Sequence, residues 1–136
     1  MEGLGRAFNL ATSATTSKVR VNLENARGVT FVLIGATSGN ATINECNAAS
    51  GGTEQALAVV TRYYTQNNGV WTKVTQAAAS TVTAATGGLL AVYVSAASLS
   101  DGFKYVDATH ASGSFVYILH DLEVQRTPAN LKAVTS

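Results

Sequence analysis

The stretch Leu-Ala-Val-Val-Thr-Arg-Tyr-Tyr-Thr-Gln-Asn-Asn-Gly-Val-Trp-Thr-Lys-Val, residues 57–74, carries the clearest fold signal in this chain of 136 residues. Both of its halves are rich in Val, Thr and aromatic residues, which favour the pleated, half-buried surface of a β-strand. Between them stands Asn67-Asn68-Gly69, and Asn and Gly tolerate the positive φ angles that tight hairpin turns require. The stretch therefore predicts two antiparallel strands joined by a short turn.

Apolar residues recur with a period of two along most of the remaining chain, or form short continuous runs. The predicted strands are 19–23, 29–34, 41–46, 80–83, 89–95, 103–108 and 114–120. With the hairpin they make about eight to ten short strands, which predicts an all-β protein. The expected fold is a compact antiparallel β-sandwich or β-barrel, jelly-roll-like. A helical turn is an alternative for Thr53–Leu57, with Thr53 as its N-cap.

The two ends of the chain lack this apolar periodicity. Residues 1–17 are small and polar in their second half, and we expect them to form an extended N-terminal arm. Pro128 ends the last predicted strand, and little that follows it is suited to burial. The expected organisation is an arm at 1–17, a β-sandwich or barrel domain at 18–127 and a C-terminal tail at 128–136.

The composition excludes several classes of protein. Charged residues make up 12% of the chain and the net charge is +1. Basic residues are too few and too scattered to bind nucleic acid. The longest apolar run, near Leu89–Val94, is too short to cross a membrane, and the N-terminus has no signal-peptide core. The low charge suits a protein that is packed against others.

No catalytic, cofactor or metal site is predicted, and we expect the protein not to be an enzyme. His110 and His120 have no metal-ligand spacing with each other or with Asp107, and are expected to be an exposed loop residue and a strand-end residue. Cys46 is the single cysteine, which rules out a disulfide framework and a multi-thiolate site. Beside Glu45, it is expected to be an unreactive strand residue.

The hairpin supplies the best candidates for partner binding. Tyr63 and Tyr64 point to opposite faces of a strand, so one of them is expected to face outward near Trp71. An exposed aromatic residue beside Asn67 and Asn68 is typical of a sugar-binding or protein-binding patch. The alternative is that one tyrosine pairs across the hairpin with Trp71 and only stabilises it.

Two segments, Leu-Ser-Asp-Gly-Phe-Lys-Tyr-Val at 99–106 and Val-Tyr-Ile-Leu-His-Asp-Leu-Glu-Val-Gln-Arg-Thr-Pro-Ala-Asn-Leu at 116–131, resemble small virion proteins of tailed bacteriophages. The similarity is greatest to those encoded in the head-gene region of actinobacterial phages, and it extends to the upstream strand at 41–46. It implies a capsid decoration, or cement, protein without cofactors that binds the major capsid protein as a homotrimer. Such a protein is located on the capsid surface of a virion assembled in the host cytoplasm.

We therefore expect a non-enzymatic decoration protein that contacts neither nucleic acid nor membrane. Arg126 and Asn130 are further candidates for partner contacts, because the C-terminal tail is expected to reach a neighbouring subunit. Two alternatives remain open. One is a carbohydrate-binding or adhesion module that uses Tyr63, Tyr64 and Trp71, and the other is a tail or head-completion subunit.

Overall fold

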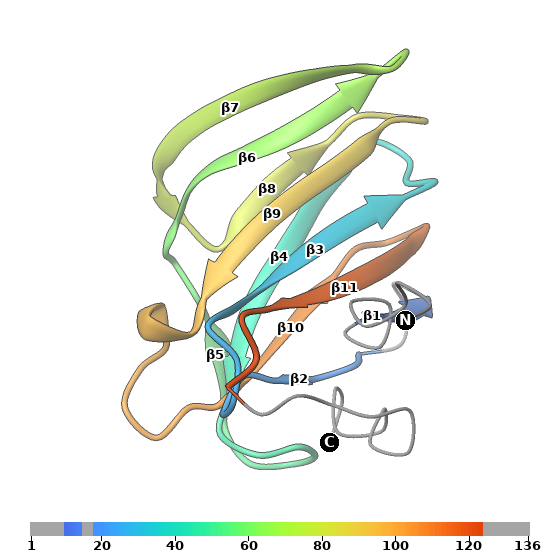
Figure 1. The fold of residues 1–136 in the computed structure, drawn as a ribbon. Coiled ribbons are helices and arrows are strands. Elements are labelled where there is room, and N and C mark those ends of the chain that lie inside the picture. The colour runs from blue at the N-terminus through green and yellow to red at the C-terminus, as the bar shows by residue number, and fades with distance from the viewer. Residues whose placement is uncertain (1–9, 15–17, 124–136) are drawn as a thin grey trace, which may run out of the picture.

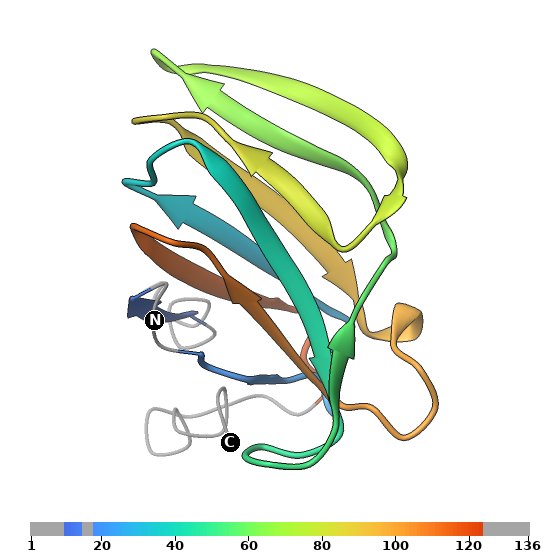
Figure 2. The same ribbon diagram turned by 180° about the vertical axis from the view of Figure 1, so that it is seen from behind.

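Two antiparallel sheets pack face to face in the computed structural model, which describes residues 10–14 and 18–123 (Figures 1 and 2). The six-stranded sheet runs in the order β1 (Leu10–Ala14), β11 (Ser114–His120), β3 (Gly28–Ile34), β9 (Leu89–Ser95), β6 (Val60–Asn67) and β7 (Val70–Ala79). The five-stranded sheet contains β2 (Val21–Asn22), β10 (Tyr105–Thr109), β4 (Gly39–Cys46) and β5 (Glu54–Ala56), with β8 (Thr81–Ala84) also paired to β4.

The connections pass back and forth between the two sheets. Strands β1-β11-β3-β9 lie over β2-β10-β4 and the β5/β8 edge, which is the strand order of a jelly roll. The β6–β7 hairpin extends the larger sheet beyond this frame. The prediction of an all-β, jelly-roll-like fold is confirmed in its sandwich form, because the sheets stay open and do not close into a barrel.

The core fills the space between the sheets with inward-pointing side chains from both. Phe31 meets Tyr117 edge to face with ring centroids 5.3 Å apart, and Phe115 packs beside them. Around these rings lie fully buried aliphatic residues, which include Val21, Val29, Leu33, Ile43, Val82, Leu90, Val92, Val94 and Val106. Strand alternation therefore decides which side chains form the core and which face outward.

The predicted hairpin is confirmed. Asn67 pairs with Val70, and the two turn residues Asn68 and Gly69 have φ values of 49° and 80°. A two-residue turn with positive φ at both positions matches the right-handed twist of the strands that it joins.

Two predicted elements differ in the structure. Residues 10–14 of the expected arm form β1, which pairs with β11 from Leu10↔Ile118 to Ala14↔Ser114. The possible helical turn at Thr53–Leu57 is instead strand β5, because β4 supplies a ladder partner for each of its residues. Residues 1–9, 15–17 and 124–136 lie outside the described part of the chain, and with them Arg126 and Asn130.

Helical structure is minor in the described residues. The short 3-10 helix η2 (Ala96–Ser98) follows β9, and the Ser95 side chain accepts a hydrogen bond from the Ala97 amide. Across residues 10–14 and 18–123, we find no helix with the length and apolar character needed to span a bilayer.

Candidate interaction surface

The outer face of the six-stranded sheet is aromatic and apolar. Ladder registers place Leu10, Ile34, Tyr64, Trp71 and Tyr93 on this one face, and each exposes 40–51% of its surface. Half-buried Val32, Ala91, Val116 and Ile118 fill the positions between them. Adjacent exposed apolar side chains form a continuous surface, and on a folded domain such a surface is typical of a binding site.

The charge on this face has one sign. Arg62 and Lys73 project from β6 and β7, and no carboxylate occupies an outward position in the described strands of this sheet. The outer face of the five-stranded sheet differs, since its outward positions are mainly polar: Asn40, Thr42, Asn44, Thr81, Thr83 and Thr109. The sandwich therefore has one apolar face and one polar face.

The hairpin residues predicted to bind a partner divide between surface and core. Tyr64 and Trp71 face outward, and Asn67 and Asn68 are exposed at the turn. Tyr63 points the other way and is 5% exposed, so it belongs to the core. The expectation that one of the two tyrosines faces outward is confirmed.

The aromatic residues do not face each other directly across the hairpin. Trp71 lies opposite Gln66, and Tyr64 lies opposite Lys73. Tyr64 and Trp71 are therefore diagonal neighbours on one face, and both remain available to a partner. Tyr93 completes the aromatic set from β9. Sequence reasoning missed it because the run from Leu89 to Val94 shows no polar alternation that would mark an outward position.

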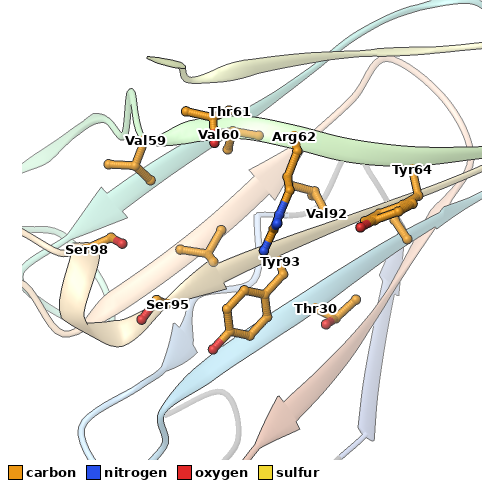
Figure 3. Close-up of a pocket in the computed structure, with 12 residues that line it drawn as sticks. Thr30, Val59, Val60, Thr61, Arg62, Tyr64, Val92, Tyr93, Ser95 and Ser98 are labelled. Carbon is orange, nitrogen blue, oxygen red and sulfur yellow. The ribbon is translucent and has the colours of Figure 1, made fainter. Parts of the chain in front are cut away.

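A groove of about 380 Å³ lies on the same face where β6 and β9 diverge (Figure 3). The two strands pair only from Tyr64↔Ala91 to Gln66↔Leu89, although β6 starts at Val60 and β9 continues to Ser95. β6 follows a segment of the other sheet, where Leu57 N–H donates to Ile43 C=O, so its first residues are still crossing between the layers.

A register shift between Val60 and Arg62 accompanies this divergence. It lies on the β7 side of β6, where the Gln76 side-chain amide donates to the carbonyl oxygens of Val60 and Thr81 at 3.1 and 2.9 Å. The amide therefore links the start of β6 to the start of β8 at the point where the β6–β7 ladder is interrupted. The groove therefore exists because the backbone of β6 diverges from that of β9.

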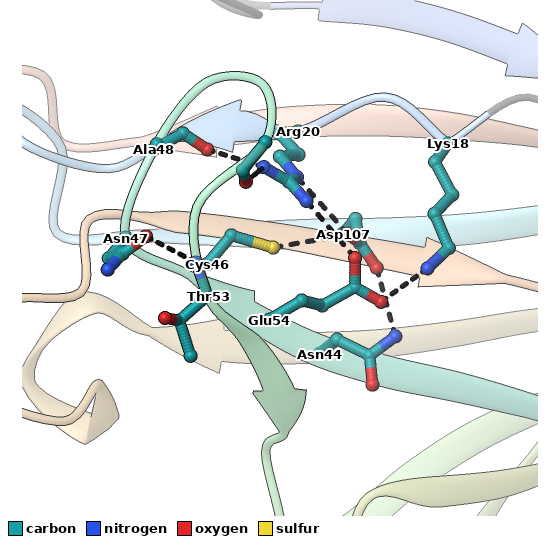
Figure 4. A network of polar contacts seen from close by, with 10 residues as sticks. Lys18, Arg20, Asn44, Cys46, Asn47, Ala48, Thr53, Glu54 and Asp107 are labelled. Atoms are coloured by element: carbon teal, nitrogen blue, oxygen red, sulfur yellow. Dashed lines mark hydrogen bonds and ion pairs between the residues drawn. The ribbon is translucent and has the colours of Figure 1, made fainter.

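A cluster of polar and charged side chains lies on the other, five-stranded sheet, around the fully buried carboxylate of Asp107 (Figure 4). Asn44 Nδ2 and the Cys46 thiol donate to it at 3.1 and 3.3 Å, and Arg20 Nε lies 3.9 Å away. Arg20 also pairs with Glu54 at 3.1 Å. Burial raises the pKa of Asp107, and burial together with the Asp107 charge raises that of Cys46 to about 12.

This cluster contains three potential metal ligands. One oxygen each from Glu54 and Asp107 and the Cys46 sulfur lie within 4.8 Å of one another. However, Arg20 and Lys18 already pair with the carboxylates, and the thiol remains protonated. A metal ion would have to compete with two cations and a proton, so the group fits a structural ion-pair network.

The guanidinium of Arg20 also organises the loop that covers Asp107. Its Nη1 donates to the carbonyl oxygens of Ala48 and Gly51 at 2.8 and 2.6 Å. Thr53 N–H, at the end of the same loop, donates to the Asn47 side chain at 2.8 Å. The network therefore holds the β4–β5 loop against the segment before β2.

Glu45, on β4, is the other buried carboxylate of the described residues, and it points to the opposite face of the sheet from Asp107. It accepts hydrogen bonds from Ser100 N–H at 2.8 Å and from Ser100 Oγ and Gln55 Nε2 at 2.5 Å. Burial acts to raise its pKa, but these donors prevail and hold the pKa below the ordinary value. Glu45 therefore ties β4 and β5 to the loop before β10.

The histidines lie apart from this cluster. His110 is buried, contrary to the expected exposed loop residue, because its Nδ1 bonds to the backbone of Ser112 within a tight turn. His120 ends β11 as predicted, where its Nε2 lies 2.6 Å from Thr30 Oγ1 and its ring contacts Tyr93. Neither histidine belongs to the one group of three potential metal ligands in the described residues.

No protein family, no curated protein and no solved structure matches this chain. Its class therefore rests on its own geometry, which is an antiparallel sandwich of jelly-roll strand order with one apolar and one polar outer face.

Proposed function

We propose that this protein is a non-enzymatic structural subunit of a bacteriophage virion that binds the outer surface of the assembled capsid and stabilises it. The observation that carries the proposal is the exposed aromatic and apolar outer face of the six-stranded sheet, with Tyr64, Trp71 and Tyr93 on its β9-β6-β7 side. The resemblance of residues 99–106 and 116–131 to phage head proteins supplies the choice of partner, the major capsid protein.

An apolar face is suited to docking, because burying it removes hydrocarbon from water. Aromatic side chains carry much of the energy in protein interfaces, since they cover a large area with few rotatable bonds. Trp71 and Tyr64 each stand on a paired strand position, so little backbone conformational freedom is lost when they are covered. The two cations on this face suit a surface that offers carboxylates around an apolar centre.

Self-association into a trimer belongs to the same proposal. Strands β1 and β7 stand at the two edges of the described six-stranded sheet, and open edges favour pairing with further strands. A symmetric assembly on a symmetric shell covers such edges and repeats one modest contact many times. Repetition lets each contact be weak while the assembled layer stays attached.

Co-sedimentation of the purified protein with empty capsids tests the proposal. We expect binding that saturates at a fixed ratio to the capsid protein, together with capsids that withstand a higher temperature. Trp71→Ala and Ile34→Ser should weaken binding about tenfold or more each, since each removes exposed apolar contact. The matched control Thr83→Ala alters the polar face and should leave binding unchanged. A protein that never sediments with intact shells contradicts the proposal.

A second candidate is a carbohydrate-binding or adhesion module, and the exposure of Trp71 favours it. An aromatic ring beside the exposed amides of Asn67 and Asn68 offers a platform and hydrogen bonds to a sugar. Quenching of the Trp71 fluorescence by glycans separates this candidate from capsid binding. A tail or head-completion subunit is distinguished by stoichiometry, because such subunits form a single ring or tube.

A further inference from the structure

We infer that the groove between β6 and β9 is a binding site for one saccharide unit that carries a carboxylate. This inference goes beyond attachment to a capsid, and it gives the second candidate function a site and a ligand class. The groove combines backbone without a partner in the described strands, a cation that pairs with no described residue, two tyrosines and several hydroxyl groups (Figure 3).

The walls of the groove hold backbone groups without a strand partner. Val92–Ser95 pair with β3 on one side, but the ladder to β6 has already ended at Ala91. Continuation of the register would set these residues opposite Val60–Tyr63, where the described strands form no ladder. The edge of β9 thus presents peptide donors and acceptors to whatever fills the groove. A ligand with several hydroxyl groups can satisfy them.

Arg62 gives the groove its charge. Its side chain extends from β6 toward β9 and makes no hydrogen bond or ion pair with any described residue (Figure 3). No Asp or Glu lines the groove. A guanidinium matches the geometry of a carboxylate and binds it through two parallel hydrogen bonds. Charge complementarity therefore favours an anionic ligand over a neutral one.

The remaining lining favours a sugar ring. Tyr93 and Tyr64 expose about half and two-fifths of their surfaces, so their rings offer apolar walls to the C–H side of a pyranose. Ser95 and Ser98 supply hydroxyl groups at one end of the groove. A volume of about 380 Å³ lies at the lower end of the range for ligand pockets, which suits one sugar unit.

Titration with methyl glucuronide tests the inference, and methyl glucoside is the matched probe, since the two differ at the carboxylate. Backbone and Arg62 Nε–H signals, followed by NMR, report where each probe binds. For a ligand of this size we expect a dissociation constant of about 1 mM for the glucuronide. The glucoside should bind about tenfold more weakly, because it lacks the charge-assisted contact.

Two variants separate the groove from the general charge of this face. Arg62→Gln should abolish the preference for the glucuronide. Lys73→Gln removes a cation on the neighbouring strand that does not line the groove, and it should keep the preference. A melting temperature measured for each variant establishes that it is folded.

Three results would overturn the inference. Equal affinities for the two glycosides would remove the role of Arg62. A tri-glutamate peptide that binds as tightly as the glucuronide would remove the preference for a sugar, because its carboxylates can pair with Arg62 without any sugar ring. The third is a complete lack of signal changes at 61–62 and 92–95 at about 10 mM probe, roughly ten times the expected constant. Capsid binding of Arg62→Gln is measured in a separate co-sedimentation experiment. Failure of the sugar site and failure of capsid binding are therefore distinguishable.

Discussion

Tyr93 lies across Gly28 on the outer face of the six-stranded sheet, so that a Cβ atom added to Gly28 would stand 2.3 Å from the Tyr93 hydroxyl oxygen. Gly28 has no positive φ, and the glycine is therefore required by the ring and not by the backbone. The Tyr93 hydroxyl reaches the carbonyl oxygen of Arg27 at 3.4 Å, and its ring contacts His120. Gly28 thus sets the position of a tyrosine that lines the groove.

Gly28→Ala should displace the outer end of the Tyr93 ring, and because this ring is half exposed and can move into solvent, the loss of stability should be about 1 kcal/mol or less. Urea unfolding measures the loss, and the ring signals of Tyr93 report the displacement. A double-mutant cycle with Tyr93→Ala provides the control, because removing the ring makes room for the methyl group. If Gly28→Ala costs the same with and without the ring, the contact is not its cause.

Trp71 and Tyr63 should respond oppositely to truncation, although both belong to the hairpin. Trp71→Ala leaves the core intact and should change the unfolding free energy by less than about 0.5 kcal/mol. Tyr63→Ala empties a core site and should cost about 3 kcal/mol. Iodide should quench the fluorescence of Trp71, the only tryptophan, in the isolated protein. An emission that iodide leaves unchanged would contradict the outward position of this ring.

Glu45 should make the protein sensitive to acid. Because its folded-state pKa lies below the unfolded value of 4.5, its stabilisation is complete above about pH 4.5. That stabilisation is lost as the pH falls through the folded-state pKa. Glu45→Gln should cost about 2 kcal/mol at pH 7 by weakening the bonds to Ser100.

Glu45→Gln should also make the free energy of unfolding depend less on pH below 4.5, which unfolding experiments at several pH values would measure. Glu24→Gln is the control, since Glu24 is an exposed carboxylate paired with exposed Lys104. Equal acid sensitivity of the Glu45 variant and the parent protein would contradict the assigned role.

Ser13 should secure the edge strand β1 through its hydrogen bond to the hydroxyl of Tyr117, whose side chain is fully buried. Ser13→Ala leaves that hydroxyl without its partner and should cost about 1–2 kcal/mol in thermal or urea unfolding. Combining Ser13→Ala with Tyr117→Phe removes both polar groups and should recover part of the loss. A double variant that is as unstable as the two single losses added together would argue against the pairing.

Local chemistry was enough to predict the strands and the hairpin. The Asn68–Gly69 turn, the alternating pattern of 103–108 and the apolar run of 114–120 depend on neighbouring residues, and the structure places strands at each. The all-β class followed from the same signals. The partner and function expected from the resemblance stay predictions, as do the contacts of Arg126 and Asn130.

Tertiary structure decided which side of each strand is covered. The run 29–34 is apolar except for Thr30, as a strand buried on both faces would be, yet Ile34 is 43% exposed because nothing described covers the outer face. Residues 10–14 carry no strand signal, and β1 forms because β11 offers a free edge.

The amino-acid sequence by itself determined the all-β class, the positions of most strands and the absence of a recognisable catalytic motif, because these follow from side-chain type and local spacing. Only the tertiary structure decided the sandwich form, the single apolar face, the groove beside Arg62 and the burial of His110. Those features arise from pairing between residues far apart in the chain, and no local pattern records which strands become neighbours.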